Sequence, residues 1–450
     1  MMIYRFSEDF EFGTATASYQ IEGAWEEGGK GESIWDRFTH QPGNIADGTT
    51  GDTACDFYHR YEEDIALAHE FGIQVYRLSV SWARILPEGT GNVSEEGIEY
   101  YKKVLSCIHK NNMKTAVTLY HWDLPQKLQD KGGFANREIA KWFEEYAKVL
   151  YRELGELVDY WITLNEPYCT SIIGNWYGEH APGYHDYSLA LLTVHNLMRC
   201  HGIAVKAFRK SGLKGKIGIT LNLNKALPAS ESLEDKEAAH RATMEATELF
   251  CDPVFLGSYP QELFSYLEKK GVILPEVTEE DQKLICQEID FLGINFYQTN
   301  YVKAKENWPL DFITIDTGRA KTDANWQVTP EGIYDTISYV YQKYNPTEII
   351  ITENGAACND WVSSDGHVKD TNRTEYLSLY LKEIYRAIEE GIPVTGYYVW
   401  CFCDNFEWAW GLSRRFGLVY VDYQTQKRIP KDSLYWYRDL IQKRYFEEGI

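Results

Sequence analysis

The chain has 450 residues and a formal net charge of −22, from 45 Lys and Arg against 67 Asp and Glu. Hydrophobic residues at 44% and charged residues at 25% are the proportions of a globular protein, which excludes a disordered or collagen-like chain. The acidity argues against nucleic acid and anionic membranes as partners, because both require a basic contact surface. Aromatic residues are frequent, at 15%, and such rings serve large cores or the stacking surfaces of sugar and base sites.

The sequence has no stretch of about 18 uncharged apolar residues, so we expect no membrane-spanning helix. Residues 1–13 contain four charged side chains and lack the apolar core of a secretory signal, so we expect a cytoplasmic protein. The nine cysteines are odd in number and form no CxxC pair, which predicts reduced thiols. His and Asp residues do not cluster as metal ligands do, so we expect no metal and no cofactor.

Eight short runs rich in Val, Ile, Tyr and Phe predict strands along the whole chain. They are Glu11–Ser18, Ile73–Trp82, Lys114–Trp122, Asp159–Glu166, Lys216–Leu223, Ile289–Tyr297, Glu348–Glu353 and Val394–Phe402. Apolar residues at helical spacing alternate with these runs and predict helices. The clearest of these stretches are Cys55–Phe71, Ser94–Asn111, Arg137–Leu154, Tyr187–Lys210, Thr371–Glu390 and Ser433–Tyr445.

Eight alternating β-α units with nearly continuous apolar strands predict a single (β/α)8 TIM barrel. An open doubly wound sheet fits less well, because it needs no particular strand count and usually has a Gly-rich first turn. Successive strands start farther apart than the roughly 30 residues of a minimal βαβ unit, so we expect long βα loops. No linker, repeat or low-complexity segment divides the chain, so we expect one catalytic domain over residues 1–450.

Two glutamates end apolar runs, Glu166 after Tyr-Trp-Ile-Thr-Leu-Asn and Glu353 after Ile-Ile-Ile-Thr. A lone glutamate in such a place is more often an ion-paired strand end, since burying an unpaired carboxylate costs several kcal/mol. The carboxyl ends of barrel strands, however, carry the active site. The fourth and seventh predicted strands face each other across the barrel mouth. The pair therefore favours two carboxylates that act on one glycosidic bond.

The segments around these glutamates, Thr163–Pro167 and Ile351–Gly355, resemble the acid/base and nucleophile signatures of glycoside hydrolase family 1, the β-glucosidase family. Four more segments resemble motifs of that family, and all six follow the family's order at predicted strand ends. They are Phe10–Ala24, Tyr120–Pro125, Gly293–Tyr297 and Asp404–Trp408. Together they form a specific signal where any one alone would be weak.

The resemblance implies a retaining, exo-acting β-glucosidase that removes the terminal non-reducing β-D-glucosyl residue of β-glucosides and cello-oligosaccharides. Activity on β-galactosides and β-fucosides stays open. By resemblance, Glu353 would attack the anomeric carbon, and Glu166 would protonate the leaving oxygen and then deprotonate water. Arg77 and Tyr297 would keep Glu353 charged, whereas burial and the nearby charge of Glu353 would raise the pKa of Glu166.

Sugar recognition needs fixed polar groups for the hydroxyls and an apolar surface for the ring. By resemblance, Gln20 and Glu407 would bind the outer hydroxyls, and His121 and Asn165 the hydroxyls nearer the reaction. Trp400 and Trp408 would contact the ring surface, and Asn295 would orient Glu166 or the sugar. Three further residues would support the site or line the leaving-group side: Trp122, Asn222 and Trp326.

Two alternative functions stay open. A 6-phospho-β-glucosidase of the same family would carry serine in place of Glu407, whose carboxylate would repel a 6-phosphate. A non-catalytic sugar-binding barrel would have lost one of the two catalytic carboxylates, and both are present. A Schiff-base aldolase is disfavoured because no predicted strand end offers a lysine. We expect small-molecule partners only, without nucleic acid or membrane, and homo-oligomer formation stays open.

Overall fold

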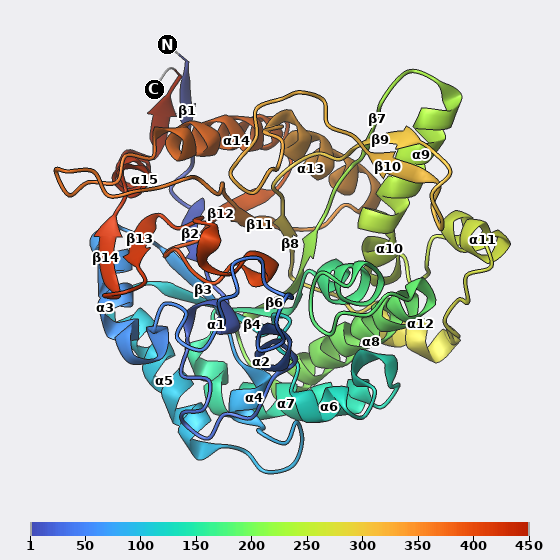
Figure 1. Ribbon diagram of the computed structural model, residues 1–450, viewed down its shortest axis with the longest axis horizontal. Coiled ribbons are helices and arrows are strands. Elements are labelled where there is room, and N and C mark those ends of the chain that lie inside the picture. Colours follow the sequence, from blue (N-terminus) through green and yellow to red (C-terminus); the bar gives the residue numbers. More distant parts are fainter. Residues whose placement is uncertain (1, 449–450) are drawn as a thin grey trace.

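The structure is a computed structural model that describes residues 2–448. Eight parallel strands close into a barrel in the order β11-β12-β2-β3-β4-β5-β6-β8 (Figure 1), which confirms the predicted (β/α)8 barrel. The barrel strands are β2 (Glu11–Ala15), β3 (Val75–Ser79), β4 (Lys114–Tyr120), β5 (Tyr160–Asn165), β6 (Lys216–Asn222), β8 (Phe291–Asn295), β11 (Ile349–Asn354) and β12 (Val394–Trp400). Every residue of β3, β5, β8 and β11 is buried, because helices cover the outer face of the barrel and side chains fill its interior.

The six helices predicted from apolar spacing are all present, with bounds within two residues of those expected. They are α3 (Phe57–Glu70), α5 (Glu95–Lys110), α7 (Ile139–Leu154), α8 (Tyr187–Ser211), α14 (Thr371–Glu389) and α15 (Asp432–Lys443). The start of α5 illustrates the local cause, since the Ser94 hydroxyl accepts a hydrogen bond from the Gly97 amide. The structure adds α13 (Glu331–Tyr344), whose Ile333, Ile337 and Val340 form a buried face.

Seven of the eight predicted strands end one to three residues earlier than expected, and a residue with positive φ lies just beyond two of them, β4 and β5. Trp122 has φ 80° and Glu166 has φ 44°, values that an extended strand does not allow. Strand β5 ends at Asn165, directly before Glu166, and β4 ends at Tyr120, two residues before Trp122. Both side chains thus belong to the loops at the carboxyl end of the barrel.

The predicted long loops carry further elements. Between β2 and β5 lie α1 (Ser18–Ile21), α2 (Ile34–Thr39), α4 (Trp82–Ile85), α6 (Gln126–Gln129), η1 (Gly133–Ala135) and η2 (Gly155–Leu157). Between β5 and β8 lie η3 (Cys169–Tyr177), β7 (Leu227–Pro228), α9 (Leu233–Thr243), η4 (Met244–Glu248), α10 (Leu249–Phe255), α11 (Gln261–Lys269) and α12 (Glu279–Ile285). Strands β9 (Tyr301–Ala304) and β10 (Phe312–Thr314) complete a three-stranded sheet with β7, and η5 (Trp408–Ser413), β13 (Val419–Asp422) and β14 (Lys427–Pro430) follow β12.

The two ends of the described chain lie side by side (Figure 1). Strand β1 (Ile3–Arg5) pairs antiparallel with β15 (Tyr445–Glu447). Within residues 2–448, no helix combines the length and the apolar character that crossing a membrane requires.

Candidate active site

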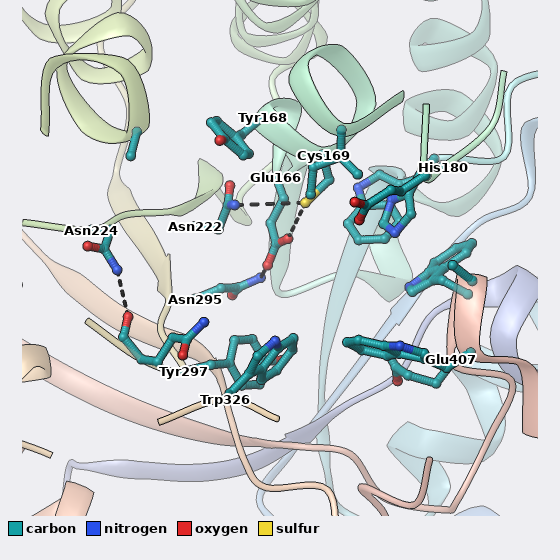
Figure 2. A pocket seen from close by; sticks show the side chains of 18 of the residues that line it. Glu166, Tyr168, Cys169, His180, Asn222, Asn224, Asn295, Tyr297, Trp326 and Glu407 are labelled. Carbon is teal, nitrogen blue, oxygen red and sulfur yellow. Dashed lines mark hydrogen bonds between the residues drawn. The ribbon is translucent and has the colours of Figure 1, made fainter. Parts of the chain in front are cut away.

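A cavity of about 750 Å³ lies among the loops that follow the barrel strands (Figure 2). Eight of the residues expected at the site line it: Trp122, Glu166, Asn222, Asn295, Tyr297, Trp326, Glu407 and Trp408. The other six lie behind this lining and contact it or one another: Gln20, Arg77, His121, Asn165, Glu353 and Trp400. The fold thus brings all fourteen residues to one place.

Glu353 is held by a cation and a hydroxyl. Its Oε1 accepts a hydrogen bond from Arg77 Nη1 at 2.6 Å, and its Oε2 accepts one from the Tyr297 hydroxyl at 2.8 Å. Arg77 is fully buried on β3 and also donates to the Thr352 carbonyl at 2.9 Å. Burial raises the pKa of Glu353, and the Arg77 cation and the Tyr297 hydroxyl oppose that rise. Both contacts favour the ionised form that a nucleophile needs.

Glu166 follows β5 and lies between an amide and a thiol. Its Oε1 accepts a hydrogen bond from Asn295 Nδ2 at 2.6 Å, and its Oε2 accepts one from Cys169 Sγ at 3.0 Å. No cation is hydrogen-bonded to this carboxyl among the described residues. Burial and the negative charge of Glu353 raise the pKa of Glu166 to about 7. The two carboxyls therefore have different surroundings, as an acid and a nucleophile require.

A network of side chains connects the two carboxyls. Strands β6 and β8 separate β5 from β11 around the barrel, and Asn295 on β8 is the cross-strand partner of Glu353. Asn295 Nδ2 also donates to Asn165 Oδ1 at 3.1 Å, and Arg77 Nη2 donates to the same oxygen at 2.7 Å. Arg77 and Asn295 thus hold both carboxyls to one rigid framework.

His121 is a neutral, buried imidazole at the back of the site. Its Nε2 lies 3.0 Å from Asn165 Nδ2, an amide donor, so Nε2 accepts and Nδ1 carries the hydrogen. Burial, and then the nearby Arg77 cation, hold the pKa of His121 well below its usual range. Its Nδ1 and the Oε1 of Gln20 are buried atoms with no hydrogen-bond partner in residues 2–448. Such atoms suit the hydroxyls of a bound sugar.

Glu407 lies at one end of the cavity, whereas Asn222 and Asn224 lie at the other, with Glu166 between them (Figure 2). Gln20 Nε2 lies 3.4 Å from Glu407 Oε2. Burial raises the pKa of Glu407 to about 8, opposed by hydrogen bonds from Trp400 and Gln20. The Glu407 side chain, expected from the sequence to be a carboxylate, is therefore largely protonated at neutral pH in the free enzyme, because a buried charge without a cation is unfavourable.

Three residues near the reacting groups were not among those predicted from the sequence. The ring centroids of Trp35 and Trp122 each lie 4.5 Å from that of Trp408, and the ring centroid of His180 lies 5.1 Å from that of Trp122. Cys169 contacts Glu166 directly. Nothing in the local spacing of Trp35, His180 or Cys169 distinguishes them from core residues, and only the folded loops bring His180 and Cys169 to the cavity and Trp35 against Trp408.

The family was decided by comparison with known proteins. The family model described as glycosyl hydrolase family 1 matches residues 2–446. The chain belongs to this family. It is therefore a glycoside hydrolase, as the six motifs had predicted.

Named relatives of glycosyl hydrolase family 1 align along nearly the whole chain. Beta-glucosidase A of Acetivibrio thermocellus is 47% identical over 98% of this chain and 99% of its own. The solved family 1 β-glucosidase from Thermotoga maritima has a TM-score of 0.97 at 46% identity, covering 100% of both chains. A bifunctional β-D-glucosidase/β-D-fucosidase of Bifidobacterium breve is 40% identical over 97% of this chain and 98% of its own.

Proposed function

We propose that this chain is a retaining, exo-acting β-glucosidase whose one catalytic domain releases terminal β-D-glucosyl residues from β-glucosides and cello-oligosaccharides. The main support is a pair of buried carboxyls in different surroundings. Glu353 accepts hydrogen bonds from Arg77 and Tyr297, whereas Glu166 has a pKa of about 7. The names of the β-glucosidase relatives support the same substrate.

In the first step, an oxygen of Glu353 attacks the anomeric carbon as the bond to the leaving oxygen breaks. Glu166 gives its proton to that oxygen, so the leaving group departs as a neutral alcohol. In the second step, Glu166, now ionised, takes a proton from water, whose oxygen displaces Glu353 and restores the β configuration. Formation of the glycosyl ester removes the charge of Glu353, which lowers the pKa of Glu166 for its second role.

The glucosyl residue binds at the Glu407 end of the cavity. Gln20 and Glu407 hydrogen-bond its outer hydroxyls, and the Nδ1 hydrogen of His121 meets a hydroxyl nearer the reaction. Trp408 and Trp400 provide the apolar surface for the ring. The leaving group lies toward Asn222, at the opposite end, and Trp326 lies on the wall between the two ends (Figure 2).

A panel of p-nitrophenyl β-glycosides together with cellobiose tests this function. We expect the β-glucoside to be hydrolysed with the highest kcat/KM, and proton NMR to show β-glucose as the first product. Some activity on the β-fucoside is expected, since one relative is named for both sugars. Absence of hydrolysis of every substrate, or α-glucose as the first product, would contradict the proposal.

A bell-shaped pH profile of kcat/KM is expected for cellobiose. Glu353 must be ionised and Glu166 protonated, so the rate falls at low pH as Glu353 gains a proton. It falls again as the pH rises through about 7, where Glu166 loses its proton. The control is 2,4-dinitrophenyl β-glucoside, whose leaving group needs no proton, so the alkaline limb should disappear. The same alkaline limb on both substrates would rule out this role of Glu166.

Discrimination against 6-phosphoglucosides should be strong. The described residues lining the cavity include no Lys or Arg but three carboxyls, Glu166, Glu179 and Glu407. The nearby Arg415 is already paired with Asp404 at 2.6 Å. Because Glu407 is largely protonated at neutral pH, the penalty comes from burying a phosphate dianion where no cation pairs with it, which costs several kcal/mol. We expect p-nitrophenyl β-glucoside to exceed its 6-phosphate in kcat/KM by about a hundredfold to a thousandfold, and parity between the two would contradict this.

We also propose that the enzyme works in the cytoplasm on small β-glucosides. All nine cysteines are unpaired, as is usual for a reducing compartment. Fractionation of the source cells tests this location, since recovery of the activity outside the cytoplasmic fraction would contradict it.

A further inference from the structure

The thiol of Cys169 lies at the wall of the cavity and contacts both Glu166 and Asn222 (Figure 2). Its Sγ is 3.0 Å from Glu166 Oε2, and Asn222 Nδ2 is 3.8 Å from Sγ. Cys169 is the first residue of η3, Asn222 ends β6 and Glu166 follows β5, so three separate segments build this row. The side chain is buried, with 5% of its surface exposed.

The hydrogen-bond directions around Glu166 follow from Arg77, which can only donate. Arg77 Nη2 donates to Asn165 Oδ1, so that atom is an oxygen, and the Asn295 atom that also meets it is a nitrogen. The same Asn295 Nδ2 donates to Glu166 Oε1. Because an amide is a stronger donor than a thiol, Oε1 is the better satisfied oxygen, and the proton of the acid belongs on Oε2, the oxygen beside Cys169.

The thiol of Cys169 faces Oε2 as a donor. The Asn222 amide hydrogen is directed at its sulfur, which leaves the S–H for Glu166. Burial and the charge of Glu166 raise the pKa of this thiol well above its usual range, so the thiol keeps its hydrogen at neutral pH. Cys169 thus offers a weak donor to the oxygen that must both release and accept a proton.

We propose that Cys169 is a positioning residue for the acid/base Glu166, donating its thiol hydrogen to Oε2 and so setting the pH at which Glu166 loses its proton. This inference rests on the proposed β-glucosidase function. A weak donor suits the two steps: it holds the ionised carboxylate in place for the second step without stabilising it so much that the acid is lost before the first.

Four other titratable or charged groups face Glu166 from the surrounding elements. They are Glu353 from β11, Arg77 from β3, Tyr297 after β8 and Glu407 before η5. None of them is altered by a substitution at Cys169. A change in the alkaline limb of the pH profile therefore reports the group at position 169.

The test compares Cys169→Ser with Cys169→Ala through the pH profile of kcat/KM on cellobiose. Serine is a stronger donor than cysteine, so it favours the carboxylate and should move the alkaline limb to lower pH by about half a unit. Alanine removes the donor and should move this limb to higher pH by a similar amount. The acid limb, which follows Glu353, should stay in place in both variants.

Cys107 provides the matched control. Its Sγ is also 3.8 Å from an amide, Asn111 Nδ2, but the structure of residues 2–448 shows no carboxylate hydrogen-bonded to it. Cys107→Ser and Cys107→Ala should therefore leave both limbs unchanged. In a Glu166→Gln background, neither substitution at Cys169 should have any effect on the pH profile.

The pH at which a limb of the profile falls does not depend on the fraction of a variant that folds. Cys169→Ser and Cys169→Ala are expected to move the alkaline limb in opposite directions. Suppose that the wild-type enzyme hydrolyses cellobiose but the alkaline limb stays in place in both Cys169 variants, or moves in the same direction in both. That result would overturn the role of Cys169. A wild-type enzyme that hydrolyses no β-glucoside would instead overturn the proposed function.

Discussion

Replacing Glu353 with alanine should reduce hydrolysis of every β-glucoside by a factor on the order of 10⁶, as does removal of a covalent nucleophile in other enzymes. No other described carboxyl meets both Arg77 and Tyr297, so none can take over the attack. Steady-state kinetics on p-nitrophenyl β-glucoside measures the loss. Circular dichroism must show that the variant is folded, because Arg77 becomes a buried cation without its partner.

Added azide provides the positive control for Glu353→Ala. The small anion fits the space left by the carboxylate and is attracted by Arg77, so it should attack the anomeric carbon directly. The product should be α-glucosyl azide, which NMR identifies. A wild-type enzyme treated with a 2-deoxy-2-fluoroglucosyl inhibitor should carry the label on Glu353, and peptide mass spectrometry that finds it on another residue would refute the assignment.

Glu166→Gln should separate substrates by leaving group. Cleavage of cellobiose needs a proton on the departing oxygen, so kcat/KM should fall by about 10² to 10⁴-fold. The value for 2,4-dinitrophenyl β-glucoside should stay close to wild type, because this leaving group departs without a proton. The glutamine amide keeps an oxygen that can accept from Asn295, so the packing is preserved.

The second step provides an independent check on Glu166. Without its base, the glycosyl-enzyme should accumulate, so kcat on the activated substrate should fall even where kcat/KM does not. Azide needs no base and should restore turnover, here with β-glucosyl azide as product. Equal losses of kcat/KM on both substrates would refute the acid role.

Most of the fold could be predicted because local patterns and the barrel agree. The eight barrel strands follow apolar runs, and α5 or α7 follow apolar residues at helical spacing. The turns at Trp122 and Glu166, just beyond β4 and β5, could not be predicted, since a positive φ at a bulky residue is imposed by the surrounding loops. The short strands of the β7-β9-β10 sheet were missed for a similar reason: their pairing joins distant segments.

Some residues of the candidate site could likewise be predicted from the sequence, and others could not. The motifs identified Glu166, Glu353 and the residues around them by number, because each motif is contiguous in sequence. His180 and Cys169 escaped, although both line the cavity, because their roles depend on which loops meet there. Glu407 was expected to be charged, and its burial without a cation reverses that expectation for the free enzyme at neutral pH.

The sequence alone predicted the barrel, the family and the two carboxyls, because periodicity and contiguous motifs are properties of the chain itself. The tertiary structure decided the surroundings of each carboxyl, with a cation and a hydroxyl beside Glu353 and an amide and a thiol beside Glu166. Arg77 reaches Glu353 across 276 residues of sequence, and Asn295 reaches Glu166 across 129. Electrostatic free energies depend on distance in space and on burial, and neither quantity exists until the chain has folded.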